Sequence, residues 1–397
     1  MNEALMQPPA ALSDQAGIDT LVYLASTADR MKSEGRPVIN MCKGELDLDT
    51  PDYVKEAGIR AIRDGETKYT SIAGTAALRE AAAEKLWAIN GLRYNPDEIL
   101  VSGGAKQGLY NLFRDCLEPG DEAILLAPYW SPYMSMLRGR KARVKVVQPC
   151  EGALKVSAET LAPALTGKTR LIVINSPNNP SGQSYSRHEL EKLAALFLRF
   201  PDLMIASDDV YEATHFTGIP ENIVNVCPEL RARVLVVNSF SKSHSMPGWR
   251  IGFSAGAGAL IGRLTRIQLE NTFNACSISQ AAAVAALRGP RDYVDALPGL
   301  LKARHDRLLG ALDCISGIRC TPSTGTFYLF PDISGLYGKL SDVHSDLEFA
   351  RYLLEAHSIA AVPGTAFGLE HHIRLCFTIE PSELDQAIAA LLETFGP

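Results

Sequence analysis

The 397-residue chain lacks any apolar run close to the roughly 18 residues that a membrane-spanning helix needs, so it predicts no membrane partner. Residues 1–15 lack a basic region followed by an apolar stretch, and so predict no secretion signal. The eight cysteines are scattered, without a CxxC pair or metal-ligand spacing, which favours reduced thiols in a cytoplasmic protein without a metal site. An excess of basic residues is absent too, since the net charge of −6 argues against a nucleic-acid partner.

What the chain does have is length and apolar content. At about 150 residues per domain, 397 residues suggest two or three domains. Apolar residues make up 46% of the chain, which excludes a disordered protein. A chain of this size buries about three quarters of its unfolded surface, so it needs neither disulfides nor a structural metal to fold.

Seven short apolar runs alternate with amphipathic stretches in the middle of the chain. The runs cover residues 98–104, 122–130, 143–148, 170–177, 203–210, 233–241 and 250–256. Continuous apolar runs that alternate with helices are typical of a mostly parallel sheet covered on both faces. We therefore predict an α/β fold with a mostly parallel seven-stranded sheet in a large domain.

The last hundred residues show a different mixture of elements. Helical patterns cover 291–313, 346–357 and the stretch after Glu380, and short apolar segments lie between them. This mixture predicts a smaller α+β domain, which the segment before residue 50 joins. We place the domain limits at 1–50, 51–290 and 291–397, with a loose arm over residues 1–15.

Polar and aromatic residues gather where the apolar runs stop. Ligands of an open parallel sheet bind outside the carboxyl ends of its strands. The residues at these ends are Ser102, Gly103, Gly104, Trp130, Asn178, Asn179, Asp208, Asp209, Ser239, Ser241 and Lys242. Because five runs deliver such groups to one expected edge, we predict a binding site there.

Two carboxylates, Asp208 and Asp209, directly follow one apolar run. Strand side chains alternate, so one should face the helix layer and the other the crevice. A carboxylate at the end of a buried strand is costly unless it meets a cation. From the residues alone, an N-cap for the next helix is the alternative.

The segment GGAKQG (103–108) also has two interpretations. It is either a tight turn or a set of backbone amides that point at an anion.

Three basic residues complete the set. Lys242 follows an apolar run beside two hydroxyls, and a lysine amine held in this way forms Schiff bases with carbonyl compounds. Arg250 lies eight residues on and suits an anion. Arg374, in an apolar strand, fits either a substrate carboxylate or a structural salt bridge. Together these groups are what pyridoxal phosphate and an amino acid require.

The chain resembles the class I/II aminotransferases of fold type I, from about residue 20 to its end. The motifs are GELDLDTP (44–51), KYTSIAGTAALR (68–79), SGGAKQ (102–107), APYW (127–130), SPNNPSG (176–182), SDDVYE (207–212), SFSKSHSMPGWRIG (239–252) and HIRLCFT (372–378). The resemblance implies a fold type I transferase that uses pyridoxal 5′-phosphate (PLP). Within this family, the chain resembles the aspartate aminotransferases.

The resemblance also implies roles around the cofactor ring. Lys242 would hold PLP as a Schiff base and then move the proton of the substrate α-carbon. Asp208, rather than Asp209, would pair with the ring nitrogen. Tyr211 and Asn179 would bond the phenolic oxygen, and Trp130 would stack on the ring.

The phosphate and the substrate would be held by further residues that the resemblance implies. The phosphate ligands would be Ser239, Ser241, Arg250 and the backbone of Gly104, Ala105 and Lys106. Tyr69 would reach the phosphate of a neighbouring subunit, which implies a homodimer with shared sites. Gly44, Asn179 and Arg374 would hold the α-carboxylate, and a cis Asn179–Pro180 bond would aim the asparagine.

Two lysines bear on the substrate. Lys106 matches a lysine that contacts the distal carboxylate in an aspartate-using subgroup, which favours aspartate or glutamate with a 2-oxo acid. Lys43 departs from the small residues of many relatives and would bind an acidic side chain or face solvent. The alternative functions on the same scaffold are a C–S β-lyase, a decarboxylase and an amino-acid oxidase. A ligand-sensing regulator is disfavoured, because 397 residues leave no room for a helix-turn-helix region.

Overall fold

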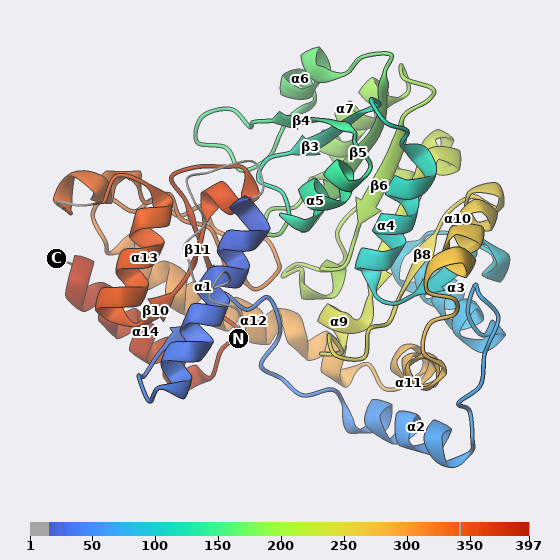
Figure 1. Cartoon of the computed structure of the whole chain (residues 1–397), viewed down its shortest axis with the longest axis horizontal. Coiled ribbons are helices and arrows are strands. Elements are labelled where there is room, and N and C mark those ends of the chain that lie inside the picture. The colour runs from blue at the N-terminus through green and yellow to red at the C-terminus, as the bar shows by residue number, and fades with distance from the viewer. Residues whose placement is uncertain (1–15, 341–342, 397) are drawn as a thin grey trace.

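A seven-stranded sheet forms the centre of the computed structural model, which describes residues 16–340 and 343–396 (Figure 1). The strand order is β2-β8-β7-β6-β5-β3-β4. The strands are β2 (Ile99–Ser102), β3 (Glu122–Leu126), β4 (Arg143–Val147), β5 (Thr169–Asn175), β6 (Met204–Asp208), β7 (Val234–Ser239) and β8 (Gly252–Ala255). β8 runs antiparallel to both neighbours, and the other pairs are parallel. Each predicted apolar run coincides with one of these strands, with only Thr169 at the start of β5 lying outside its run, so the predicted sheet is confirmed.

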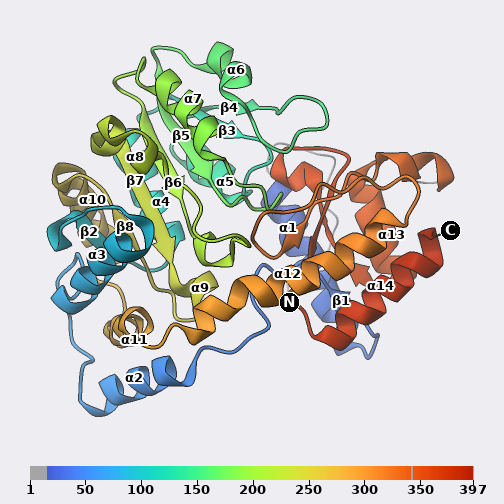
Figure 2. The ribbon, with the colours of Figure 1, turned by 180° about the vertical axis from the view of Figure 1, so that it is seen from behind.

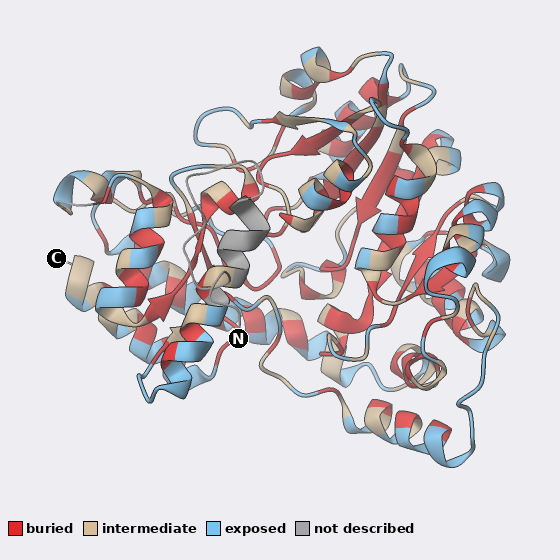
Figure 3. Ribbon diagram, in the orientation of Figure 1, coloured by how far each residue is buried: buried red, intermediate tan, exposed pale blue. Residues whose placement is uncertain are grey.

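Helices cover both faces of this sheet, as the unbroken apolar runs require. On one face, Leu235 and Val237 of β7 pack in a cluster with residues of α4, α5 and α10. On the other face, Val234 and Val236 pack with residues of α3, α7, α8 and α11. The strands other than β4 are accordingly buried over nearly their whole length, whereas the edge strand β4 is mostly half-buried and the helices alternate buried and exposed residues (Figure 3).

The helices around the sheet have the following bounds. They are α2 (Asp52–Arg63), α3 (Ala76–Asn90), α4 (Ala105–Cys116), α5 (Pro132–Gly139), α6 (Ala158–Leu161), α7 (Arg187–Phe197), α8 (Ile223–Val226), α9 (Phe240–Ser243), α10 (Gly258–Asn271) and α11 (Ser277–Arg288). Short 3₁₀ segments are η2 (Pro96–Glu98), η3 (Ala162–Ala164), η4 (Glu212–Thr214) and η5 (Pro228–Arg233).

A second group of elements forms its own apolar core beside the large sheet (Figure 2). It comprises α1 (Ala16–Ser33), β1 (Ile39–Asn40), α12 (Asp292–Asp313), β9 (Tyr328–Leu329), η6 (Ser334–Lys339), α13 (Asp346–His357), β10 (Ile359–Ala360), β11 (Val362–Pro363), η7 (Gly364–Phe367), β12 (Ile373–Cys376) and α14 (Pro381–Phe395). β1 pairs with β10 through Ile39 and Ile359, so the segment before residue 50 lies with the C-terminal elements. The domain limits at 50 and 290 themselves stay a prediction.

The described part of the chain holds no helix long and apolar enough to cross a membrane. Within the same ranges, no three His, Cys, Asp or Glu side chains gather where they could hold a metal ion. The arm expected over residues 1–15 lies outside the described residues.

Candidate active site

A cavity of about 380 Å³ opens at the carboxyl edge of the sheet, between the sheet and the second group of elements. Its lining contains the predicted residues Gly44, Ala105, Lys106, Trp130, Asn179, Asp208, Tyr211, Ser239, Ser241, Lys242, Arg250 and Arg374. Segments more than 300 residues apart in the chain therefore meet at one place. The sequence prediction rested on convergence at the ends of the strands, and the residues do meet there, while their binding roles stay a prediction.

Asp208 ends β6 at one wall of the cavity and is 3% exposed. Its Oδ2 accepts a hydrogen bond of 2.5 Å from the Oη of Tyr133, and Asn175 Nδ2 donates to its backbone oxygen. Burial raises the pKa of Asp208 to about 6, while Tyr133 and Lys242 oppose the rise. The carboxylate is thus held in place, but no cation of the described residues pairs with it, and a cationic group of a ligand would stabilise its ionised form.

Asp209, the next residue, faces away from the cavity. Its two carboxylate oxygens accept hydrogen bonds from Ser207 Oγ (2.7 Å) and Asn222 Nδ2 (2.6 Å). The alternation expected of strand residues therefore separates the two carboxylates, and only Asp208 lies on the cavity wall.

Lys242 lies in α9, one short turn after β7, and its Nζ donates to the backbone oxygen of Gly44. Among the described residues no carboxylate forms an ion pair with it. Burial lowers the pKa of Lys242 to about 8. A lysine amine with a lowered pKa is neutral in a larger fraction of molecules and can act as a nucleophile or a base.

One end of the cavity gathers hydrogen-bond donors. Ser239 and Ser241 bond each other through their hydroxyls (3.0 Å), and the side chain of Arg250 reaches the backbone oxygen of Gly103. Gly104, at φ +86°, precedes α4, and a Cβ there would lie 2.9 Å from Arg250 Nη2. Gly104 is not on the cavity lining but lets the guanidinium approach the start of α4. Hydroxyls, a guanidinium and a helix N-terminus together suit a phosphate.

Arg374 lies at the opposite end, buried in β12. Its Nη1 donates to Asn179 Oδ1 (3.1 Å) and its Nη2 donates to the backbone oxygen of Cys42, while its Nε has no partner in the part of the chain that the structure describes. The guanidinium lies 4.6 Å from the ring centroid of Tyr328. No carboxylate of the described residues pairs with Arg374, so the structural salt bridge left open by the sequence is not formed there. The Asn179–Pro180 bond is cis, as predicted.

The remaining predicted residues differ in where they lie. Trp130 lines the cavity, and Lys106 Nζ lies 5.8 Å from its ring centroid. Lys43 also lines the cavity and forms an ion pair of 3.6 Å with Asp29. Tyr69 is 85% exposed, packs edge-on against Phe273 and is absent from the lining.

Three lining residues with polar side chains were missed by the sequence reasoning, namely Tyr133, Asn175 and Tyr328. Tyr328 Oη lies 3.1 Å from Tyr211 Oη, and Asn175 joins the ends of β5 and β6. Each lies in a mostly apolar stretch of sequence that we expected to be core. The one feature that could have indicated a site residue was a polar side-chain atom within that stretch.

A second cavity, of about 310 Å³, lies on the other side of α9, and Ser239 lines both. Its wall carries the ion pair of Lys85 and Glu212, in which both side chains are at most 13% exposed. Asn90 Nδ2 donates to the second oxygen of Glu212 at 2.6 Å. The charges on this wall therefore satisfy each other.

Comparison with known proteins adds the family. The chain matches the family described as "Aminotransferase class I and II" over residues 36–391. It is 42% identical to the aspartate/prephenate aminotransferase of Nitrosomonas europaea over 376 residues, covering 93% of this chain and 94% of that one. It is 38% identical to an aspartate aminotransferase of Rhizobium meliloti, covering 98% and 96% of the two chains.

Solved structures agree with this result. The aspartate aminotransferase from Rhizobium meliloti superposes with a TM-score of 0.90 at 36% identity, covering 98% of each chain. The Thermus thermophilus aspartate aminotransferase with maleate gives a TM-score of 0.89 at 33% identity, covering 97% of this chain and all of that one. The predicted fold and enzyme class are thereby confirmed. The chain belongs to the class I and II aminotransferases.

Proposed function

We propose that the protein is a PLP-dependent aminotransferase that moves an amino group between an L-amino acid and a 2-oxo acid in two half-reactions. The observation that carries this proposal is the pairing, in one cavity, of a lysine of lowered pKa with a buried carboxylate that lacks a cation. A hydroxyl and guanidinium cluster lies at one end of the cavity and a buried arginine at the other. The family supports the same conclusion.

The residues of the cavity fit PLP. Ser239, Ser241, Arg250 and the first turn of α4 would bind the phosphate, and Trp130 would cover one face of the ring. Asp208 would stay ionised against the ring nitrogen, and Tyr211 with Asn179 would bond the phenolic oxygen. When bound, PLP supplies an electron sink for the electron pair left at the α-carbon.

Lys242 would carry the covalent link and the proton. Its Nζ would form the Schiff base in the resting enzyme and, once free, take the proton from the substrate α-carbon and return it to the cofactor side. A pKa near 8 suits this exchange at neutral pH, because both protonation states are accessible.

Arg374 would bind the α-carboxylate through two parallel hydrogen bonds, with Gly44 and Asn179 beside it. The bonds of Arg374 to Asn179 and to the Cys42 carbonyl support this role, because they hold the guanidinium plane fixed before substrate arrives. Such preorganisation reduces the entropy that binding costs.

We favour dicarboxylic substrates such as aspartate and glutamate. Lys106 and Lys43 both line the cavity and supply positive charge for a distal carboxylate. The relatives are aspartate or aspartate/prephenate aminotransferases, and the Thermus thermophilus structure was solved with maleate, itself a dicarboxylate.

We further propose a homodimer in which Tyr69 completes the phosphate site of the partner subunit. A tyrosine 85% exposed next to the half-exposed Phe273 supports this arrangement, as do the exposed Ile59 and Ile62 of α2. A cytoplasmic location stays a prediction of the cysteine pattern.

The test is the visible absorption of the purified protein with PLP, before and after addition of L-aspartate, L-glutamate, L-alanine and L-phenylalanine. We expect a yellow chromophore that aspartate or glutamate bleaches and a 2-oxo acid restores. Pyruvate and ammonia formed from L-cysteine, whose β-carbon carries a thiol that can leave, without a new amino acid would indicate elimination instead. A protein that stays colourless with added PLP would overturn the cofactor assignment.

A further inference from the structure

Tyr133 lies in the first turn of α5, and its side chain is almost fully buried. Its ring packs edge-on against Trp130 (5.3 Å between centroids) and Phe113 (6.5 Å). From this packed position its Oη donates the 2.5 Å hydrogen bond to Asp208 Oδ2. No motif of the resemblance includes Tyr133.

The bond is the shortest that the Asp208 carboxylate makes. The other contact is from the backbone amide of Val210 to Oδ1 at 3.4 Å, so Oδ1 is the less engaged oxygen. The remaining ionisable groups around Asp208 are Lys242, Tyr211 and Asp209. Lys242 is the only cation among them, and Tyr133 is the only side chain that donates to the carboxylate in the described structure.

The phenol of Tyr133 keeps its proton at neutral pH and donates a hydrogen bond to Asp208. Burial and the neighbouring carboxylate raise the pKa of its phenol well above 10. A donor that cannot lose its proton stabilises the ionised form of its acceptor. The direction agrees with the pKa of Asp208, which Tyr133 lowers against the larger effect of burial.

We propose that Tyr133 is a positioning residue that keeps Asp208 ionised and aims its Oδ1 at the ring nitrogen of bound PLP. The inference rests on the proposed function. A ring nitrogen and a carboxylate share one proton, and the hydrogen bond from Tyr133 favours its residence on nitrogen. Protonated nitrogen is what makes the ring an effective electron sink.

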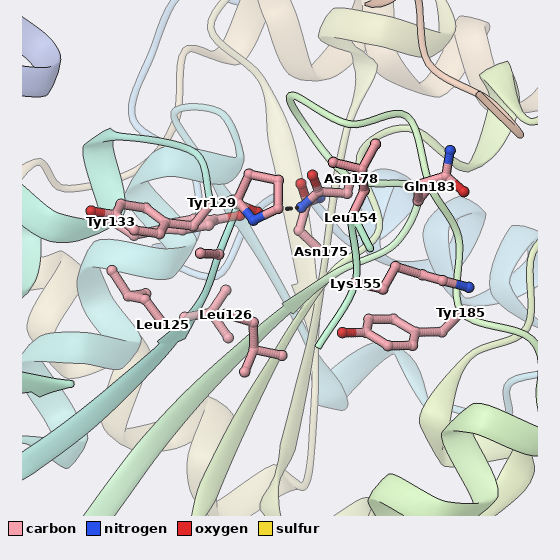
Figure 4. A pocket seen from close by; sticks show the side chains of 13 residues that line it. Leu125, Leu126, Tyr129, Tyr133, Leu154, Lys155, Asn175, Asn178, Gln183 and Tyr185 are labelled. Carbon is pink, nitrogen blue, oxygen red and sulfur yellow. Dashed lines mark hydrogen bonds between the residues drawn. The ribbon is translucent and has the colours of Figure 1, made fainter. Parts of the chain in front are cut away.

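A purely structural role for Tyr133 is the alternative. Tyr133 and Asn175 also line a small cavity of about 20 Å³, which has room for about one water (Figure 4). Tyr185 lies on the other side of this cavity, is 7% exposed, and donates through its Oη to the backbone oxygen of Val156 at 3.0 Å. Tyr185 is therefore a matched control: a buried tyrosine with one hydrogen bond, but none to Asp208.

The experiment records the ¹⁵N NMR signal of PLP labelled at the ring nitrogen in the holoenzyme of wild type, Tyr133→Phe and Tyr185→Phe. Tyr133→Phe keeps the ring and removes the donor. We expect the ratio of protonated to neutral nitrogen to fall roughly tenfold in Tyr133→Phe, as for loss of a hydrogen bond to a charged acceptor. Tyr185→Phe should match wild type.

A wild-type signal in Tyr133→Phe would overturn the role of Tyr133 while leaving the proposed function intact. A wild-type protein that binds no labelled PLP would overturn both. A second measurement does not depend on how Tyr133→Phe folds: a singly fluorinated tyrosine at position 133 is a stronger donor of nearly the same size. It should shift the signal toward protonated nitrogen, and a shift the other way would contradict the inference.

Discussion

Two cavities of similar volume flank α9, but their charges are arranged in opposite ways. On one side, neither Lys242 nor Asp208 contacts a group of opposite charge among the described residues, and burial shifts the pKa of both. On the other side, Lys85 and Glu212 satisfy each other, with Asn90 on the remaining oxygen. Volume therefore does not distinguish a candidate active site from a structural void in this protein. The presence of buried charged groups without a partner of opposite charge does distinguish them.

The largest effect should come from Lys242→Met. Removal of the amine should lower kcat by on the order of a thousandfold or more, because the proposed nucleophile and proton carrier is one group. The change should also abolish the yellow chromophore while the protein keeps its fold. Steady-state kinetics and circular dichroism check this. Residual activity above one hundredth of wild type would place the catalytic amine elsewhere.

The same substitution in the other cavity should do the reverse. Lys85→Met leaves Glu212 buried without its cation, so the free energy of unfolding should fall by about 3–5 kcal/mol. The folded fraction should keep a kcat within about twofold of wild type. Urea unfolding followed by assays at low temperature measures both. If folded Lys85→Met were inactive, the second cavity would belong to the catalytic machinery.

The pH dependence of stability sharpens the comparison. The pKa of Lys242 is lowered in the folded chain to about 8 from an ordinary value of 10.5, so below pH 8 folding has to bury a charged amine. In the absence of PLP, Lys242→Met should therefore be more stable than wild type at pH 7, by on the order of 3 kcal/mol. This advantage should disappear between pH 8 and 10.5. Urea titrations at pH 7 and pH 10 test the sign, and a constant difference would contradict it.

The smallest effect concerns the packing of the active cavity. A Cβ on Gly44 would lie 2.6 Å from Tyr328 Oη but 3.7 Å from its Cζ. Gly44→Ala should therefore raise KM for the amino acid, with a loss of about 1–3 kcal/mol in kcat/KM. Addition of Tyr328→Phe removes the colliding oxygen and should recover much of the loss. Additive effects in the double variant would show that the collision is not the cause.

Much of this site was predictable because it depends on chain direction and alternation. Parallel strands end at one edge, and alternation turns Asp208 and Asp209 to opposite faces. Asp208 and Lys242 could therefore be placed together from their positions at the ends of apolar runs. The resemblance then assigned Asp208 to the cavity, as the structure has it.

The missed residues depend on contacts that no local pattern contains. In the sequence, Tyr133 looks like an apolar residue of a short helix. Its hydroxyl donates to Asp208, which lies 75 residues further along the chain, and no local pattern predicts that hydrogen bond. Tyr328 likewise occupies a strand of two residues, and its Oη lies 3.1 Å from Tyr211 Oη and next to Gly44. In the proposed homodimer Tyr69 would reach a phosphate in the second subunit, an arrangement that no contact within one chain expresses.

One reversed strand has a large consequence for how the site is assembled. Because β8 is antiparallel to β7, the start of β8 lies at the edge where β7 ends. The short connection from Ser239 to Gly252 consequently never leaves that edge, and it carries both Lys242 and Arg250. A parallel strand in the place of β8 would need a crossover of a dozen or more residues and would begin at the far edge, with the guanidinium there. In the proposed enzyme, the reversed strand lets a single loop carry both the lysine that would attach PLP and the arginine that would bind its phosphate.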